Sequence, residues 1–339
     1  MKKLLTLAVA AALTMSVAVA SAATTLQLSE VHAEGYPTTL ADQEFARLVE
    51  ERTEGRIKIE VYSGGQLYGE ETGAIEAMQL GDLAFSRVSA SPVSSYVPAM
   101  NAIQMPYLYK NADHMWAVLD GEIGQNMLEE VEASGSGLVG LCWYDAGARN
   151  FYTTKQVSSV ADMAGLKIRV QNNAMMVDMV NVLGGTGVTG IGPNEVYSAI
   201  TQGTIDGAEN NWPTYQNMGD YEAAPYFVLD EHTRVPEILL ASAAVLSELD
   251  PADVEIIKQC AKETQEFEKE KWAEKEAEAE QIVRDHGCTI TELDADAYAE
   301  FQAAMTEPSD ALGGQSLYEK YGAEYQDIID AITAVGEDF

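Results

Sequence analysis

The segment from Pro251 to Gly287 constrains the fold more than any other part of the chain. Asp250 is a suitable helix cap, Pro251 suits the first helical position and Gly287 suits the end, so the pattern predicts one uninterrupted helix. At 1.5 Å per residue, such a helix is roughly 55 Å long. One small lobe is shorter than that, so we expect the helix to run along two lobes, with its many Glu and Lys side chains in solvent.

The rest of the chain alternates between strand and helix patterns. The predicted strands are residues 25–31, 56–62, 83–88, 137–143, 151–154, 166–170, 188–191, 227–230 and 238–245, and the predicted helices are 39–53, a helix ending at Gly81, 175–183 and 193–202. Repeated strand–helix–strand order predicts an α/β fold of two lobes with largely parallel sheets and a cleft between them. We expect lobe I to comprise residues 23–147 and about 236–270, lobe II residues 148–235 and about 271–310, and residues 311–339 to form a C-terminal helix.

Residues 1–22 have the pattern of a secretory signal peptide. Lys2 and Lys3 precede an apolar run over residues 4–20, and Ala20-Ser21-Ala22 forms an A-x-A cleavage site. The alternative is a membrane anchor, but the run is marginal for spanning a bilayer and no basic flank follows it. We therefore expect the mature protein to work outside the cytoplasm, in the periplasm.

The charge balance excludes several classes of partner. The 339 residues include 54 Asp and Glu against 20 Lys and Arg, which gives a net charge of −34. Such a surface repels phosphate backbones and anionic lipids, so we expect neither nucleic-acid nor membrane-surface binding. Four His and three Cys leave few ligands for a transition metal, and we expect no metal or other cofactor. The predicted helix holds Cys260 and Cys288 roughly 40 Å apart, which indicates free thiols.

A glycine-rich stretch offers a rival interpretation of the chain. Residues 185–190 fit G-x-G-x-x-G, and Asp206 lies where a ribose-binding acid would follow, as in an exported α/β enzyme with a dinucleotide cofactor. However, these glycines follow a predicted helix and precede a strand, whereas the dinucleotide motif follows a strand and opens a helix. The context instead indicates a helix C-cap.

Catalytic and metal-binding motifs are absent from the sequence. It contains no G-x-S-x-G, H-E-x-x-H, C-x-x-C or Walker motif. Asp230, Glu231 and His232 are consecutive, so in a strand their side chains would point to alternating faces rather than to one metal ion. We therefore predict that the protein is not an enzyme.

Two arginines lie late in predicted strands. Arg87 follows Phe85 on the same face of the strand 83–88, and Arg169 ends an alternating pattern over 166–170. The carboxyl ends of strands in α/β sheets line the ligand crevice, and the guanidinium fork matches a carboxylate. The alternative for either arginine is an internal salt bridge in this acidic chain.

Residues 204–213 (TIDGAENNWP) have the composition of a polar turn that ends in an aromatic. The amides of Asn210 and Asn211 offer donors and acceptors to hydroxyl groups, and the face of Trp212 suits the C–H side of a sugar-like ring. Taken alone, the segment would be a loop with a buried tryptophan.

Together, these segments resemble the periplasmic solute-binding subunits of TRAP transporters, the DctP type. The resemblance covers residues from about 25 to 240. Its motifs, in order, are Gly64-Gly65-Gln66-Leu67 with Glu70, IEAMQLG (75–81), Arg149 before FYTT (151–154), GLKIRV (165–170), Glu195-Val196-Tyr197 and DGAEN (206–210).

The resemblance implies a two-lobed periplasmic binding protein fold that closes on an organic acid. It implies delivery of that acid to TRAP integral membrane subunits that use an ion gradient, and we expect the binding subunit to be a monomer. By the same correspondence, Arg169 grips the ligand carboxylate and Arg149 supports it. Asn172 and Asn210 contact the ligand, and Glu71 faces it from the other lobe.

Two further features concern the ligand. Gly192-Pro193-Asn194 stands where the family usually has Pro-Phe-Gly, so the usual aromatic is absent and Trp212 is expected to pack on the ring instead. Residues 31–34, 86–88 and 209–213 look like the sugar-acid branch, which implies a hexuronate or aldonic acid whose hydroxyls bond His32, Arg87 and the amides. The alternatives are a dicarboxylate or another hydroxy or oxo acid, and a periplasmic sensor with the same pocket.

Overall fold

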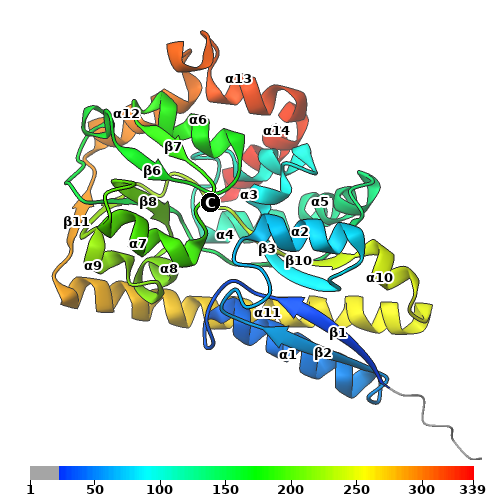
Figure 1. Cartoon of the computed structure of the whole chain (residues 1–339). Coiled ribbons are helices and arrows are strands. Elements are labelled where there is room, and N and C mark those ends of the chain that lie inside the picture. The colour runs from blue at the N-terminus through cyan, green and yellow to red at the C-terminus, as the bar shows by residue number, and fades with distance from the viewer. Residues whose placement is uncertain (1–22) are drawn as a thin grey trace, which may run out of the picture.

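The computed structural model describes residues 23–339, so the predicted signal peptide lies outside the described residues. Two mixed sheets form two lobes (Figure 1). The first sheet has the order β2 (Ile57–Tyr62), β1 (Thr24–Ser29), β3 (Phe85–Ser89), β10 (Glu237–Ser242), β4 (Leu138–Tyr144). The second has the order β11 (Thr289–Glu292), β9 (Tyr226–Leu229), β5 (Asn150–Thr153), β8 (Gly207–Asn210), β6 (Lys167–Arg169), β7 (Thr186–Val188).

Helices and short helical turns surround both sheets. The helices are α1 (Pro37–Arg52), α2 (Glu71–Leu80), α3 (Ala90–Val93), α4 (Ala112–Leu119), α5 (Glu122–Ala133), α6 (Ala174–Val182), α7 (Val196–Thr201), α8 (Trp212–Asn217), α9 (Asp220–Ala223), α10 (Ala243–Ser247), α11 (Pro251–His286), α12 (Ala295–Thr306), α13 (Leu317–Gly322) and α14 (Gln326–Val335). The segment 311–339, expected as one helix, instead contains the two short helices α13 and α14 with 3-10 turns around them.

Helix α11 has the predicted bounds and runs along both lobes (Figure 1). The Asp250 side chain accepts a hydrogen bond from the Ala252 amide at 2.8 Å, and Gly287 adopts the left-handed conformation that ends the helix. Near its start, Ile257 belongs to the same apolar cluster as strands β1 and β4. Near its end, Val283 packs in a cluster of the second lobe. The helix therefore supports both lobes from one side.

The sheets are less parallel than predicted. Strands β2, β1 and β3 are parallel to one another, as are β8, β6 and β7, but β10 and β5 run antiparallel to both of their neighbours. Each of these two strands is the first that the chain forms after crossing between the lobes. A strand that enters its sheet from the cleft runs against strands that end there, so its first residue lies at the cleft edge.

The two crossing segments lie side by side. They join β4 to β5 and β9 to β10, and the Arg149 amide donates to the Thr233 carbonyl at 2.8 Å in an isolated antiparallel bridge. This bridge places Arg149 at the junction of the lobes, one residue before β5 begins.

The segment 204–213, predicted as a turn, contains the strand β8 and the start of α8. All four residues of β8 are buried in the second sheet. A Cβ at Gly207 would lie 2.2 Å from the Tyr152 carbonyl oxygen, so only glycine allows β5 to pair at this position. The polarity of Glu209 and Asn210 misled the prediction, because both side chains are buried against Arg149. The predicted strand 238–245 is also shorter, because Ser242 ends β10 and caps α10.

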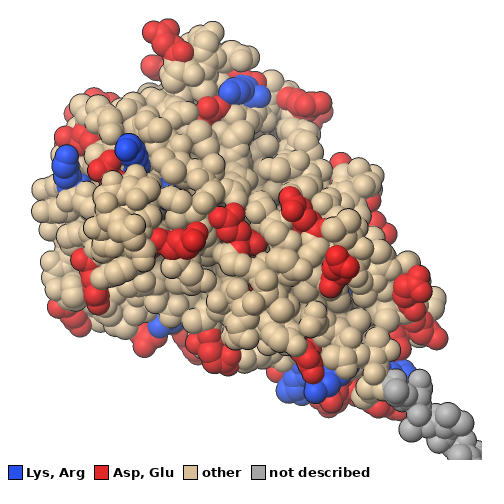
Figure 2. Space-filling view, in the orientation of Figure 1, with Lys and Arg blue, Asp and Glu red and all other residues tan. Residues whose placement is uncertain are grey.

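The structure also bears on the expectations about cysteines, membrane-crossing helices and surface charge. Cys142 and Cys260 are buried free thiols, and Cys288 is a half-buried one. Within residues 23–339, no helix has the length and apolar character needed to cross a bilayer. Figure 2 shows acidic side chains spread over the visible face with few basic ones, as the net charge of −34 requires.

The G-x-G-x-x-G stretch has the context expected of a helix C-cap. Helix α6 ends at Val182, Gly184 has a φ of +85°, and the strand β7 follows at once. No helix opens at these glycines, so no helix N-terminus is available to a pyrophosphate. Gly187 has a packing role instead, because a Cβ there would lie 2.7 Å from the Val177 Cα on α6.

This packing role predicts the effect of one substitution. Gly187→Ala should lower the free energy of unfolding by about 1–3 kcal/mol, because backbone rather than a flexible side chain meets the added methyl group. Urea unfolding followed by circular dichroism measures the change. Gly69→Ala is the control, because a Cβ there meets nothing within 4 Å. Equal stability of the two variants would contradict the packing role.

Candidate ligand-binding site

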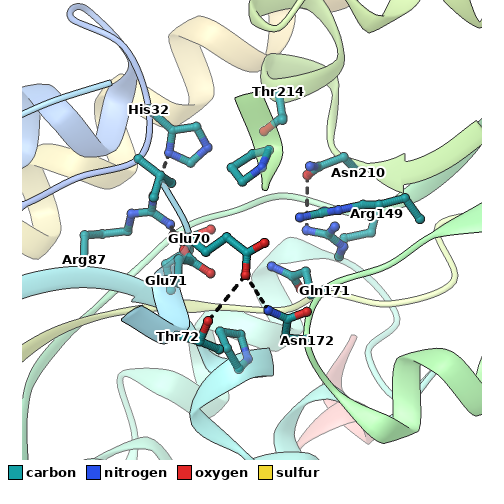
Figure 3. A pocket seen from close by; sticks show the side chains of 15 residues that line it. His32, Glu70, Glu71, Thr72, Arg87, Arg149, Gln171, Asn172, Asn210 and Thr214 are labelled. Atoms are coloured by element: carbon teal, nitrogen blue, oxygen red, sulfur yellow. Dashed lines mark hydrogen bonds and ion pairs between the residues drawn. The ribbon is translucent and has the colours of Figure 1, made fainter. Parts of the chain in front are cut away.

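A cavity lies between the lobes, where the cleft edges of the two sheets meet (Figure 3). Both lobes line it, and seven of the eight predicted site residues are among its lining. The lining residues are Val31, His32, Glu70, Glu71, Thr72, Arg87, Pro92 and Glu237 from the first lobe, and Arg149, Arg169, Gln171, Asn172, Pro193, Asn210 and Thr214 from the second.

Trp212 is the predicted site residue that does not line the cavity. Its ring stacks on Phe227 at a centroid distance of 3.9 Å, and 6% of the residue is exposed. The first turn of α8 turns it toward the apolar cluster between β9 and α11. The expectation that Trp212 packs on a ligand ring is therefore wrong for this structure, and the alternative of a buried tryptophan holds. Thr214, two residues later, lines the cavity instead.

Arg87 is enclosed by acidic groups. Its Nε donates to Glu30 at 2.9 Å and its Nη1 donates to Glu71 at 2.6 Å. Glu237 accepts a further bond from Nη1, and Glu30 and the Nδ1 atom of His32 lie on Nη2. A guanidinium has five N–H groups, and these contacts use all five. Arg87 therefore has no donor left for a ligand hydroxyl, contrary to the expectation from the resemblance, and the salt-bridge alternative describes it.

The contact with Arg87 keeps the Glu30 carboxyl ionised. Burial opposes ionisation of this carboxyl, but Arg87 and His32 hold its pKa well below the usual range. Burial and the Arg87 charge lower the pKa of His32, so its imidazole is neutral. The Nδ1 atom of His32 lies 2.8 Å from Nη2 of Arg87 and 3.0 Å from a Glu30 oxygen, so it bonds one or the other according to the tautomer, and Nε2 is the ring nitrogen left for the cavity.

Arg149 is nearly, but not completely, satisfied. Its Nε and Nη2 hold the Glu209 carboxylate, with Nη2 at 2.9 Å, and Nη2 also donates to the Glu209 carbonyl at 2.8 Å. Its Nη1 donates to the Asn210 side-chain oxygen at 3.1 Å (Figure 3). One N–H on Nη1 has no partner among residues 23–339. Because the Asn210 oxygen also accepts from the Asn211 amide, its NH2 group is the part that remains available.

Behind Arg149, a buried histidine links two acids. His232 Nδ1 lies 2.9 Å from Asp230 and Nε2 lies 3.4 Å from Glu209. Burial opposes its protonation, but the two carboxylates outweigh burial and raise the pKa of His232 to about 9. Within the segment 230–232, Asp230 and His232 bond each other. Glu231 pairs with Arg234 at 3.0 Å, and no group of residues within 23–339 could hold a metal ion.

Arg169 differs from the other two arginines. Its Nε donates to the Ile191 carbonyl at 2.9 Å, and no carboxylate of residues 23–339 forms an ion pair with it. Only 8% of the residue is exposed, and burial lowers its pKa. The four N–H groups on Nη1 and Nη2 therefore have no partner within residues 23–339. A buried guanidinium in this state is costly unless an anion meets it.

Hydrogen bonds join the lobes across the cavity. Asn172 donates to Glu70 at 2.9 Å, as the dashed line in Figure 3 marks, and the Asn172 oxygen accepts from the Gly190 amide at 3.0 Å. Tyr36 and Thr214 share a bond of 2.9 Å between their hydroxyls. The described conformation is therefore a closed one, with both lobes in contact around the cavity.

Sequence reasoning missed several acidic residues of the site: Glu70 and Glu237 line the cavity, and Glu30 and Glu209 pair with Arg87 and Arg149. Glu30 lies near the end of the predicted strand 25–31, and strand ends of this kind line the cleft, so the sequence alone could have identified it. Glu237 was not recoverable, because it lies at the start of β10 and only the antiparallel entry of that strand brings it beside Arg87.

The unequal pairing of the arginines predicts unequal effects on stability. Arg87→Met and Arg149→Met should each lower the free energy of unfolding by about 3–5 kcal/mol, because each leaves buried carboxylates without a cation. Arg169→Met should leave it unchanged or raise it, because the removed charge pairs with no carboxylate of the described residues. Urea titrations of the ligand-free proteins compare the three variants. A loss in Arg169→Met as large as in the other two would contradict the assignment.

His232 predicts a pH dependence of stability. A pKa raised from its ordinary value of 6.5 to about 9 stabilises the fold fully below pH 6.5. That contribution, on the order of 3 kcal/mol, is lost as pH rises through about 9. Unfolding free energies at pH 6 and pH 10 should therefore differ more in the wild type than in His232→Gln. The same difference in both proteins would show that His232 is not protonated in the fold.

The comparisons with known proteins agree with this site. The family model for bacterial extracellular solute-binding protein, family 7 (DctP), matches residues 28–313. A TRAP periplasmic solute-binding protein from Pseudomonas putida F1 with bound D-glucuronate is 35% identical, with a TM-score of 0.85 over 92% of this chain and 97% of that one. Its counterpart from Xanthobacter autotrophicus Py2 with bound β-D-galacturonate is 34% identical, with a TM-score of 0.84 over 91% and 99%.

A sequence relative gives the same result. A solute-binding protein of Chromohalobacter salexigens is 34% identical over 306 residues, which are 90% of this chain and 87% of the relative. These proteins bind solutes and are not enzymes, which removes the dinucleotide-enzyme alternative. The chain belongs to bacterial extracellular solute-binding protein family 7, the periplasmic binding subunits of TRAP transporters.

Proposed function

We propose that this protein captures a hexuronate in the periplasm and delivers it to TRAP integral membrane subunits. The observation that carries this proposal is the unpaired Nη edge of Arg169, the one cavity arginine of the described chain that has no carboxylate of its own. Two parallel N–H···O bonds from this edge would hold the ligand carboxylate, and the remaining Arg149 N–H would add a third. The two uronate-bound relatives support this choice of ligand.

The other cavity groups suit a polyhydroxylated ligand. The amides of Asn210 and Gln171 and the Nε2 of His32 offer bonds to hydroxyls from both lobes. The Gln171 side-chain oxygen is buried without a partner within the described residues, as expected of a group whose partner is the ligand. Asn172 and Glu71 retain, beside the bonds they already make, one N–H and one oxygen for the same purpose.

Closure of the lobes follows from a ligand that contacts both of them. Such a ligand binds the closed state more tightly than the open one and shifts the population toward it. We propose residues 23–147 with about 236–270, and 148–235 with about 271–310, as the two units that move. The segment 145–149 and its neighbour 230–236 would be the hinge, and the closed surface would be the one that the membrane subunits recognise.

The central test removes the proposed carboxylate anchor. A micromolar site corresponds to about −8.2 kcal/mol, and loss of one partner of a buried ion pair costs about 3–5 kcal/mol. Arg169→Ala should therefore weaken D-galacturonate or D-glucuronate binding by more than a hundredfold in isothermal titration calorimetry. Arg169→Lys should also bind weakly, because an ammonium cannot form the two parallel bonds.

Arg47→Ala is the matched control, because Arg47 is an exposed residue of α1 whose partners are Glu44 and Glu51. This variant should bind as the wild type does. Binding by Arg169→Ala within threefold of the wild type would reject the assigned role.

A further inference from the structure

We propose that the acidic residues around Arg87 form a charge filter that admits sugar acids with one carboxylate and rejects those with two. This inference rests on the proposed function, and it names the part of the cavity that selects within the class of sugar acids. We call the set Glu30, Glu71, Glu237 and Arg87 the acidic cage.

The acidic cage has more negative charge than its arginine can neutralise. Three carboxylates contact one guanidinium, so the fully ionised set has a net charge of −2. Burial, together with Glu71 and Glu30, raises the pKa of Glu237 to about 7 despite the nearby Arg87. A further negative charge placed here would meet no free cation, because every N–H of Arg87 is already used.

Two carboxylate oxygens of the acidic cage remain open to the cavity. Glu71 accepts from Arg87 and from the Ser89 amide through Oε1, and Glu237 accepts from Arg87 through Oε2. No donor among residues 23–339 bonds the Oε2 of Glu71 or the Oε1 of Glu237. Both residues line the cavity. Glu70 adds another carboxylate on this side, bonded to Asn172 and Thr72 through Oε2 only.

The opposite side of the cavity has the reverse polarity. Within the described part of the chain, Arg169 presents four N–H groups without a partner and Arg149 presents one. A ligand carboxylate is therefore directed to the second lobe, and the far end of the ligand meets the acidic cage. A hydroxyl there donates to a free carboxylate oxygen, which makes a short, strong hydrogen bond. A carboxylate at the same carbon has no proton to donate and is repelled.

Within the acidic cage, Glu237 is placed at the cleft edge by the strand topology. Because β10 enters the first sheet antiparallel to β3, its first residue lies across from Ser89 at the cleft edge, beside Arg87. A glutamine at this position would keep the shape and the acceptor oxygen but remove one charge. Glu237 is therefore the position at which selectivity between one and two carboxylates is set most directly.

The test compares D-galacturonate with galactarate, the six-carbon acid with a carboxylate at each end. Isothermal titration calorimetry on the full mature chain at pH 8 should show galactarate binding at least a hundredfold weaker than D-galacturonate. In Glu237→Gln and Glu71→Gln, the ratio of the two dissociation constants should narrow by tenfold or more. D-Galacturonate forms a ring and galactarate is an open chain. This difference cancels in the change of the ratio from wild type to variant.

Glu76→Gln is the control, since Glu76 is an exposed residue of the same helix as Glu71 and does not line the cavity. It should leave the ratio unchanged. Galactarate binding within tenfold of D-galacturonate in the wild type, or an unchanged ratio in both cage variants, would overturn the filter alone. Absence of binding by both D-galacturonate and D-glucuronate would instead reject the proposed function.

Discussion

A buried guanidinium is costly without an anion, and the site depends on how this chain pairs its three cavity arginines, Arg87, Arg149 and Arg169. Among residues 23–339, Arg87 contacts three carboxylates and Arg149 contacts one, while Arg169 bonds only a backbone carbonyl at 2.9 Å. Two cavity arginines are thus paired with carboxylates of the described residues, and the third, Arg169, is not. The third is where an external carboxylate gains most, because the cost of burying the charge has already been met by the fold.

The topology explains how these charges come together. Parallel strands deliver their carboxyl ends to the cleft, which places Arg87 and Arg169 there. The two antiparallel strands begin at the same edge, where Glu237, the first residue of β10, lies beside Arg87 and Arg149, one residue before β5, lies beside Asn210. The crossing segments that make these strands antiparallel are also the connections between the lobes, so the site and the hinge share residues.

Much of this arrangement could be predicted from the sequence. The caps fixed the ends of α11, and late strand positions predicted that Arg87 and Arg169 lie at a cleft. The partners of those arginines could not be predicted, because pairing depends on which strands run antiparallel. The segment around Gly207 was misjudged for a related reason. Its polar residues look solvent-exposed in the sequence, yet Glu209 and Asn210 are bonded to Arg149 inside the second sheet.

The orientation of the bound acid tests the central claim most directly. A crystal structure of the protein with D-galacturonate should place both carboxylate oxygens about 2.7–2.9 Å from the Nη1 and Nη2 atoms of Arg169, with hydroxyls toward Glu71 and Glu237. A uronate bound the other way round, with a hydroxyl at Arg169 and its carboxylate elsewhere in the cavity, would contradict the account.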